Sequence, residues 1–283
     1  MNNLKTVGLL AFMTTLLWLV AIALFPDGGF MIGLIFAVGF NLLAYFFSDK
    51  LALAASRAKP VTEEELPQVY AIVRRLALQT KMPEPRIYLI DSPQPNAFAT
   101  GRSPRKAAVA VTTGILQVLT VDELEGVLAH ELAHVRNRDI LISSIAAMIA
   151  AALTMLARMA FWFGGGDNRE SPLGAIGAIL SLIVAPIAAM LIRLAISRTR
   201  EFQADETGAE ITGRPMVLAS ALEKISAGTA KIPMNVNPAT AQLFIDNPMK
   251  AARGGGGMMR LLSTHPPTEE RIERLTRIAT GIR

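Results

Sequence analysis

Residues 120–139 read TVDELEGVLAHELAHVRNRD and form the most informative stretch of the sequence. Thr120 followed by Glu123 is a capping box, in which each side chain satisfies a backbone N–H group of the other residue at a helix start. Apolar residues follow at helical spacing and predict one buried face, made of Val121, Leu124, Val127, Leu128 and Val135. We therefore predict a helix that starts after Thr120 and carries a polar site on another face.

Within this helix, His130-Glu131-Leu132-Ala133-His134 forms an H-E-x-x-H pattern. Residues four apart share a helix face, so both imidazoles can reach one ion. Glu131 lies about 100° further around the helix, where it can act on a water at that ion without being a ligand. The alternative is a chance arrangement of surface residues. Two of only three histidines at this spacing, with a glutamate between them, favour a zinc site.

A catalytic zinc ion takes three protein ligands and keeps one position open. Because residue 140 is Ile, the metzincin pattern with a third histidine six residues after His134 is excluded. Carboxylates remain as third ligands, and the nearest candidates are Asp139, Glu201, Asp205 and Glu210.

The heights of these residues above two hydrophobic blocks favour Glu201. Helices that continue the blocks place His134 and His130 roughly 9 and 15 Å above residue 140, and Glu201 roughly 13 Å above residue 192. Asp205 follows one turn later, where its carboxylate can hold a ligand imidazole by the other nitrogen. The alternative for Glu201 is a salt bridge to a neighbouring arginine.

Two further features lie near the C-terminus. His265 precedes a predicted helix, and it or Arg271 can donate to the oxyanion at a scissile carbonyl; alternatively, His265 only caps the helix. Residues 228–258 are rich in Pro, Asn and Gly and end in four glycines at 254–257, which predicts a flexible loop or flap.

The composition is that of a membrane protein. Of 283 residues, 52% are hydrophobic and only 18% charged, with a mean hydropathy of +0.39, whereas soluble domains carry about 25% charged residues. The lack of cysteine excludes disulfides, thiolate metal sites and cysteine nucleophiles. The net charge of +5 suits an anionic membrane face, and no basic run with interleaved aromatic residues points to nucleic acid.

Four apolar blocks are predicted to span the bilayer, because a transmembrane helix needs about 20 mostly apolar residues. They run from Thr6 to Phe25, Gly29 to Phe47, Ile140 to Phe163 and Leu173 to Ile192. The chain thus divides into a transmembrane hairpin at 1–50, a first catalytic part at 51–139, a second hydrophobic hairpin at 140–196 and a second catalytic part at 197–283. Two alternatives are a cleaved signal peptide for the first block and a buried hairpin for the last two.

Lys and Arg residues lie next to the apolar blocks on the side of the polar regions. They are nearly missing from the two short links between paired blocks. Because positive residues favour the cytoplasmic side, both termini and both catalytic parts are predicted to face the cytoplasm. The polar regions themselves have an α+β composition. Helices are predicted from Thr62 to about Lys81, at 197–211, at 215–225 and at 266–278, and strands at 86–91, 97–100 and 107–112.

These motifs together resemble the HtpX family of membrane-bound zinc metalloproteases and, more distantly, the eukaryotic CAAX prenyl proteases. The resemblance covers essentially the whole chain. It is carried by NAFATG at 96–101, AHELAHVRNRD at 129–139, SRTREFQAD at 197–205, and THPP with ERI at 264–272. It implies an α+β membrane protein with about four transmembrane helices and a cytoplasmic gluzincin-like domain, in which a small sheet lies beside the H-E-x-x-H helix.

The resemblance also implies residue roles. His130, His134 and Glu201 bind one zinc ion, Glu131 is catalytic, and Asp205 supports a ligand. Asn96 and Ala97 lie on a strand edge, where an extended substrate adds as another strand.

The implied function is that of a multi-pass endopeptidase of the bacterial inner (plasma) membrane. It cleaves misfolded or damaged membrane proteins on the cytoplasmic side, in quality control and stress response. Its partners are these substrates, the lipid bilayer and regulatory membrane proteins, with no nucleic acid. Glu131 takes a proton from the attacking water and passes it to the leaving amine.

Three other functions are less consistent with the sequence. A zinc-binding scaffold or chaperone needs the two histidines and Glu201 but not Glu131, whose presence favours catalysis. An intramembrane protease is disfavoured because the many charges of residues 122–139 are costly in hydrocarbon. A transporter is disfavoured because the predicted spans lack paired ionisable residues at mid-depth.

Overall fold

The computed structural model describes residues 29–137, 198–234, 241–248 and 266–281, with single positions at 7, 8, 11, 12, 14, 15, 18, 139, 141, 143, 145 and 236. The predicted spans at 6–25, 140–163 and 173–192 lie mostly outside these residues. His265 and the four glycines at 254–257 also lie outside them.

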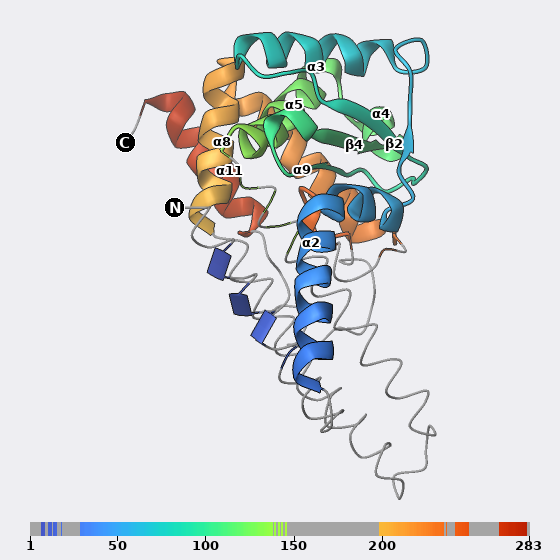
Figure 1. Cartoon of the computed structure of the whole chain (residues 1–283). Coiled ribbons are helices and arrows are strands. Elements are labelled where there is room, and N and C mark those ends of the chain that lie inside the picture. The colour runs from blue at the N-terminus through green and yellow to red at the C-terminus, as the bar shows by residue number, and fades with distance from the viewer. Residues whose placement is uncertain are drawn as a thin grey trace, which may run out of the picture.

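A four-stranded sheet lies at the centre of the described residues, in the order β1-β2-β4-β3 (Figure 1). Its strands are β1 Lys59–Pro60, β2 Arg86–Ile90, β3 Ala97–Thr100 and β4 Ala108–Thr112. The central strands β2 and β4 are parallel, and β1 and β3 add antiparallel at the two edges. The three predicted strands are confirmed to within a residue at each end. Strand β1 was not predicted, because two residues are too few to show a strand pattern. The short helices η1 Pro104–Lys106 and α4 Thr113–Val118 flank β4.

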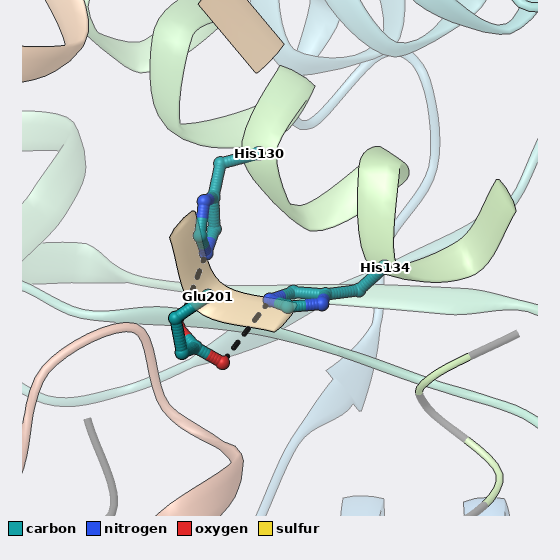
Figure 2. A group of neighbouring side chains, drawn as sticks. All are labelled: His130, His134 and Glu201. Atoms are coloured by element: carbon teal, nitrogen blue, oxygen red, sulfur yellow. Dashed lines mark ion pairs between the residues drawn. The ribbon is translucent and has the colours of Figure 1, made fainter. Parts of the chain in front are cut away.

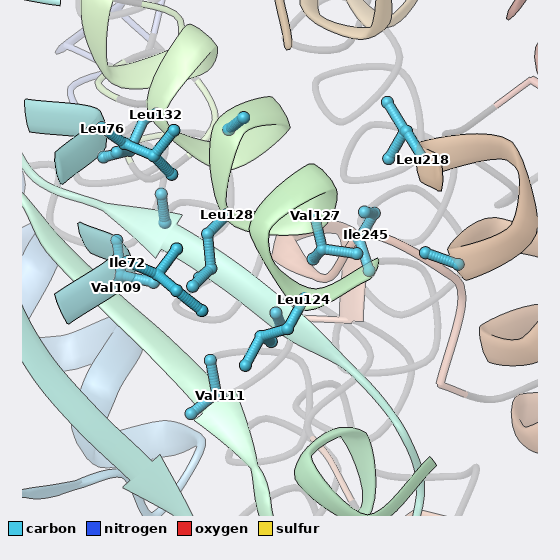
Figure 3. Close-up of a cluster of buried hydrophobic side chains, with 14 of the residues drawn as sticks. Ile72, Leu76, Val109, Val111, Leu124, Val127, Leu128, Leu132, Leu218 and Ile245 are labelled. Carbon is cyan, nitrogen blue, oxygen red and sulfur yellow. The ribbon is translucent and has the colours of Figure 1, made fainter. Parts of the chain in front are cut away.

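Both faces of the sheet are buried. Successive residues of a strand point to opposite sides and therefore contribute to different cores. Val109 and Val111 of β4 pack into the larger core, with helices α3 Pro67–Gln79, α5 Val121–Arg136 and α9 Pro215–Lys231 (Figure 3). Ala108 and Ala110 point the other way, into a smaller core. There they meet the C-terminal end of α2 Gly29–Ala55 and the buried residues Leu243 and Phe244.

Helix α5 starts as predicted. The Thr120 side chain accepts a hydrogen bond from the Glu123 N–H at 3.3 Å, and the Glu123 carboxylate accepts one from the Thr120 N–H at 2.8 Å. Four of the five predicted core residues are buried, but Val121 is wrong, since it is 50% exposed. Helical side chains point toward the N-terminus, so that of the first residue extends past the core.

The helix predicted from Thr62 begins instead at Pro67. The Glu65 carboxylate accepts a hydrogen bond from the Thr62 N–H at 2.7 Å. One of the two hydrogen bonds of the predicted capping box is therefore present, but it lies in a turn before the helix. The ring of Pro67 disfavours helical geometry at Leu66, whose φ is −134° and ψ 61°. Proline then takes the first helical position, where its missing N–H costs no hydrogen bond.

The C-terminal helices are α8 Arg198–Thr212, α9 Pro215–Lys231 and α11 Thr268–Thr280. The predicted loop at 228–258 is wrong at 228–231 and 241–243, while its other described residues form neither helix nor strand. Helix α9 continues to Lys231, and a short helix η2 Ala241–Leu243 follows. Leu243, Phe244 and Ile245 are buried: Ile245 packs into the larger core, and Leu243 and Phe244 pack into the smaller one.

Helix α2 contains the second predicted span, continues past residue 50 and projects away from the sheet (Figure 1). Several of its apolar side chains are exposed, including Phe30, Met31 and Ile35. Within the residues that the structure describes, no helix combines the length and the apolarity that crossing a membrane requires. The four spans stay predictions.

Candidate metal and catalytic site

The structure brings His130, His134 and Glu201 together (Figure 2). Their ligand atoms all lie within 4.8 Å of one another. One oxygen of Glu201 lies 3.8 Å from His130 Nε2, and the other lies 3.5 Å from His134 Nε2. The two imidazoles come from successive turns of α5, and the carboxylate comes from α8, which packs along it.

Helix α8 lies close against α5 at Gly208. A Cβ atom added there would lie 3.0 Å from the backbone N of His130, closer than ordinary packing allows. Because Gly208 has no side chain, the two helices meet at the first histidine. Glu201 lies about two turns earlier on α8 and is thereby brought to the histidine pair.

Each imidazole is also held through its other nitrogen. His130 Nδ1 lies 2.9 Å from Asp205, and His134 Nδ1 lies 3.5 Å from Asp139. A carboxylate at Nδ1 favours the tautomer with the proton there, which leaves the Nε2 lone pair directed at Glu201. Arg271 in turn fixes Asp205, donating from Nε and Nη2 at 2.8 and 2.6 Å.

Glu131 lies between the histidines and the sheet. It is 3% exposed, and its carboxylate accepts a hydrogen bond from the Ala99 N–H of β3 at 2.8 Å. The carboxylate is therefore oriented by the edge strand of the sheet, next to the ligand group but outside it.

The electrostatics of the two histidines differ. Burial lowers the pKa of His130 to about 4, which keeps the ring neutral at neutral pH. Burial also acts to lower the pKa of His134, but the carboxylates of Glu201 and Asp139 outweigh it and raise that pKa to about 9. For Asp205, burial acts to raise the pKa, yet Arg271 brings it down to about 2. The carboxylates thus favour a positive charge beside His134.

The charges and donor types at this site fit a divalent cation such as zinc. Among the described residues, two guanidinium groups (Arg200 and Arg271) and four carboxylates (Glu131, Asp139, Glu201 and Asp205) surround the two histidines. A zinc ion with bonds of about 2.0–2.1 Å separates tetrahedral ligands by about 3.3 Å. The observed separations of 3.5 and 3.8 Å between ring nitrogens and Glu201 are close to this spacing.

The other predicted site residues lie nearby. Asn96 and Ala97 lie at the start of the edge strand β3, and both are fully buried. Arg271 is also buried, on α11. Asp139, a candidate third ligand from the sequence, lies instead at Nδ1 of His134, a position that its place five residues further along the chain could have signalled.

An H-E-x-x-H helix beside a small sheet, with a glutamate from a later helix, defines the class of metallopeptidases. The family description "Peptidase family M48" matches residues 63–279, and the chain belongs to this family of metallopeptidases. It is 50% identical over 286 residues to a "Protease HtpX homolog" of Thermococcus sibiricus, covering 99% of this chain and 97% of that protein. The fold is similar to the crystal structure of Ste24p from S. mikatae, with a TM-score of 0.52 and 21% identity. That match covers 97% of this chain and 65% of the other.

Proposed function

We propose that the protein is a zinc-dependent endopeptidase of the membrane. The observation that carries the proposal is the convergence of His130 Nε2 and His134 Nε2 on Glu201, with Glu131 beside them. His130, His134 and Glu201 would hold the ion, while Asp205 and Asp139 would orient the two rings. A zinc ion bound there supplies a water whose pKa is about 7 and polarises a peptide carbonyl.

Glu131 is the proposed general base and acid. Its carboxylate accepts the proton of the attacking water and delivers it to the leaving amine, so no acyl-enzyme forms. Arg271 and His265 are the proposed donors to the oxyanion. The Arg271 guanidinium already donates from Nη1 to a peptide carbonyl, that of Ile245, at 3.2 Å, which supports a carbonyl-binding role. Asn96 and Ala97 are the proposed edge for an extended substrate.

The proposed substrates are misfolded or damaged membrane proteins, cleaved on the cytoplasmic side. The high apolar content and the four apolar blocks support a bilayer location, and the positive flanks support this orientation. Regulatory membrane partners belong to the same proposal. Extraction of cell membranes at high pH tests the location, since an integral protein stays in the pellet and release into the supernatant would contradict it.

The central test compares casein cleavage by the detergent-purified wild type and the Glu131→Gln variant, with bound zinc measured in both. We expect equal zinc content and a loss of about 10²–10⁴-fold in cleavage rate, the usual contribution of a general base. Glu206→Gln, at an exposed position of α8, is the matched control and should cleave normally. Appreciable turnover by Glu131→Gln would exclude the proposed role.

The second candidate is a zinc-binding scaffold or chaperone without catalysis. The buried ligand group alone is equally suited to it, but a buried Glu131 oriented beside that group favours the enzyme. Zinc in wild type and variant, with cleavage by neither, would favour the scaffold.

A further inference from the structure

Two residues of the chain itself lie on the edge of β3. The Ile245 N–H donates to the Ala97 carbonyl at 2.8 Å. The side-chain amide of Asn96 pairs with both backbone groups of Asp246: its oxygen accepts the N–H at 3.3 Å, and its nitrogen donates to the carbonyl at 2.9 Å. Because residues 245 and 246 pair with 97 and 96, this segment runs antiparallel to β3, as an added strand would.

The same segment reaches the proposed catalytic group. Arg271 Nη1 donates to the Ile245 carbonyl at 3.2 Å, while Nη2 of that guanidinium lies 3.4 Å from His130 Nδ1. Four consecutive backbone groups, the N–H and carbonyl of Ile245 and of Asp246, are therefore bound by Ala97, Arg271 and Asn96. Binding through the backbone alone takes any extended peptide, whatever its sequence.

We infer that residues 244–247 occupy the position of an extended substrate and hold the enzyme in a self-blocked state. This inference rests on the proposed peptidase function. Ala97 and Asn96 are the groups that a substrate strand needs, and the Ile245 carbonyl lies at the donor proposed for the scissile carbonyl. A substrate can pair with β3 only after this segment, named here the edge segment (residues 244–247), moves off the strand.

The edge segment is anchored outside the ligand group. The Thr229 hydroxyl on α9 donates to the Asp246 carboxylate, and both residues are buried. The Gln94 side chain donates to the Pro248 carbonyl at 2.9 Å, and the Phe244 ring packs edge-on against Phe98 with centroids 5.0 Å apart. These anchors can be changed without touching the proposed zinc ligands or Glu131.

A reversible crosslink tests whether the segment must move. The chain has no cysteine, so Thr229→Cys with Asp246→Cys creates a single pair, placed where the two side chains now touch. We expect the oxidised protein to lose at least tenfold of its cleavage of an extended peptide, and a phosphine reductant to restore it. Equal cleavage by the oxidised and reduced forms would overturn the inference and make residues 244–247 a fixed wall of the site.

A second variant decides the matter if the cysteine pair folds poorly. Thr229→Val keeps the shape of the side chain but removes the donor to Asp246. It should raise cleavage by roughly two- to tenfold, the population shift expected from one lost hydrogen bond. An unchanged or lower rate in a folded, zinc-loaded Thr229→Val protein would overturn the inference. Failure of the proposed function is recognised separately, since wild type and Thr229→Val would then both bind zinc and neither would cleave.

Discussion

Buried carboxylates lie at both ends of helix α5, and their charges are balanced differently at the two ends. At the N-terminal end, Glu123 accepts from Lys224 Nζ at 2.8 Å and Glu125 accepts from Arg75 at 2.7 Å. The exposed fractions of the Lys224 and Arg75 side chains are 40% and 53%, so the two cations reach in from solvent. Each carboxylate there has a protein cation.

At the C-terminal end, the described residues include four carboxylates but only two guanidinium groups. Arg271 lies 2.6 Å from Asp205, and Arg200 lies 3.7 Å from Asp139. Glu201 instead faces two imidazoles, which act as ligands when neutral. A carboxylate matched to a lysine or arginine indicates a structural pair. Carboxylates that face imidazole Nε2 atoms indicate a metal site.

The largest expected effect comes from removing the carboxylate that faces the histidines. Glu201→Ala should abolish casein cleavage and remove most bound zinc, because two imidazoles alone rarely retain the ion. In the wild type, adding zinc to metal-free protein should raise Tm, since a ligand that binds only the folded state stabilises it. The variant should lose that shift, while Glu210→Ala, exposed on the same helix, should keep it. A zinc-dependent Tm shift that survives in Glu201→Ala would break the proposed contrast.

At the other end of α5, the expected effect is on stability. Burial acts to raise the pKa of Glu123, but Lys224 and the Thr120 N–H lower it to about 2, from 4.5 in the unfolded chain. Glu123 therefore stabilises the fold by about 2–3 kcal/mol above pH 4.5, and this contribution is lost as the pH falls to 2. Wild type should exceed Glu123→Gln in unfolding free energy at pH 6, and the gap should close near pH 2. Denaturant unfolding at both pH values measures it, and a pH-independent gap would contradict this assignment.

Local signals explain why the sequence predicted α5 and the two histidines on one of its faces. The capping box spans four residues, and the two histidines lie one turn apart, so both depend on contacts within one helix. The strands at Ala97–Thr100 and Ala108–Thr112 likewise followed from short apolar runs between turns. Such features are specified by residues that lie close together in the sequence.

Long-range features were harder to predict. The proximity of Glu201 to the histidines depends on how closely α8 packs against α5. Gly208 permits this close packing, and no local sequence pattern predicts it. The link from Arg271 to Asp205 joins two helices far apart in the sequence. The prolines, asparagines and glycines around 243–245 predicted a flexible loop, but they gave no sign that this apolar triplet is buried in the cores.

The carboxylate behind His130 should matter less than a ligand. Asp205→Asn keeps the size and one acceptor oxygen but removes the charge that orients the ring at Nδ1. Zinc affinity should fall by about 10–100-fold, the usual effect of losing such a partner. The matched change Glu125→Gln, at the other end of α5, should leave zinc affinity unaltered. Competition with a zinc-binding dye measures both, and equal losses in the two variants would show that the ends of α5 are not separate.

The smallest expected effect comes from adding a methyl group at each of two glycines, one packed near each end of α5. A Cβ at Gly208 meets the His130 backbone at 3.0 Å, whereas one at Gly126 meets Leu218 of α9 at 3.3 Å. Alanine favours a helix over glycine by up to about 1 kcal/mol, and overpacking costs about 1–3 kcal/mol. Gly126→Ala should therefore be nearly neutral in unfolding free energy, while Gly208→Ala should lose about 1 kcal/mol. Because Gly208 sets the approach of Glu201 to the histidines, Gly208→Ala should also weaken zinc binding several-fold, and Gly126→Ala should not. Unchanged zinc affinity in Gly208→Ala would mean that α8 tolerates a shift and that Glu201 reaches the histidines without this close approach.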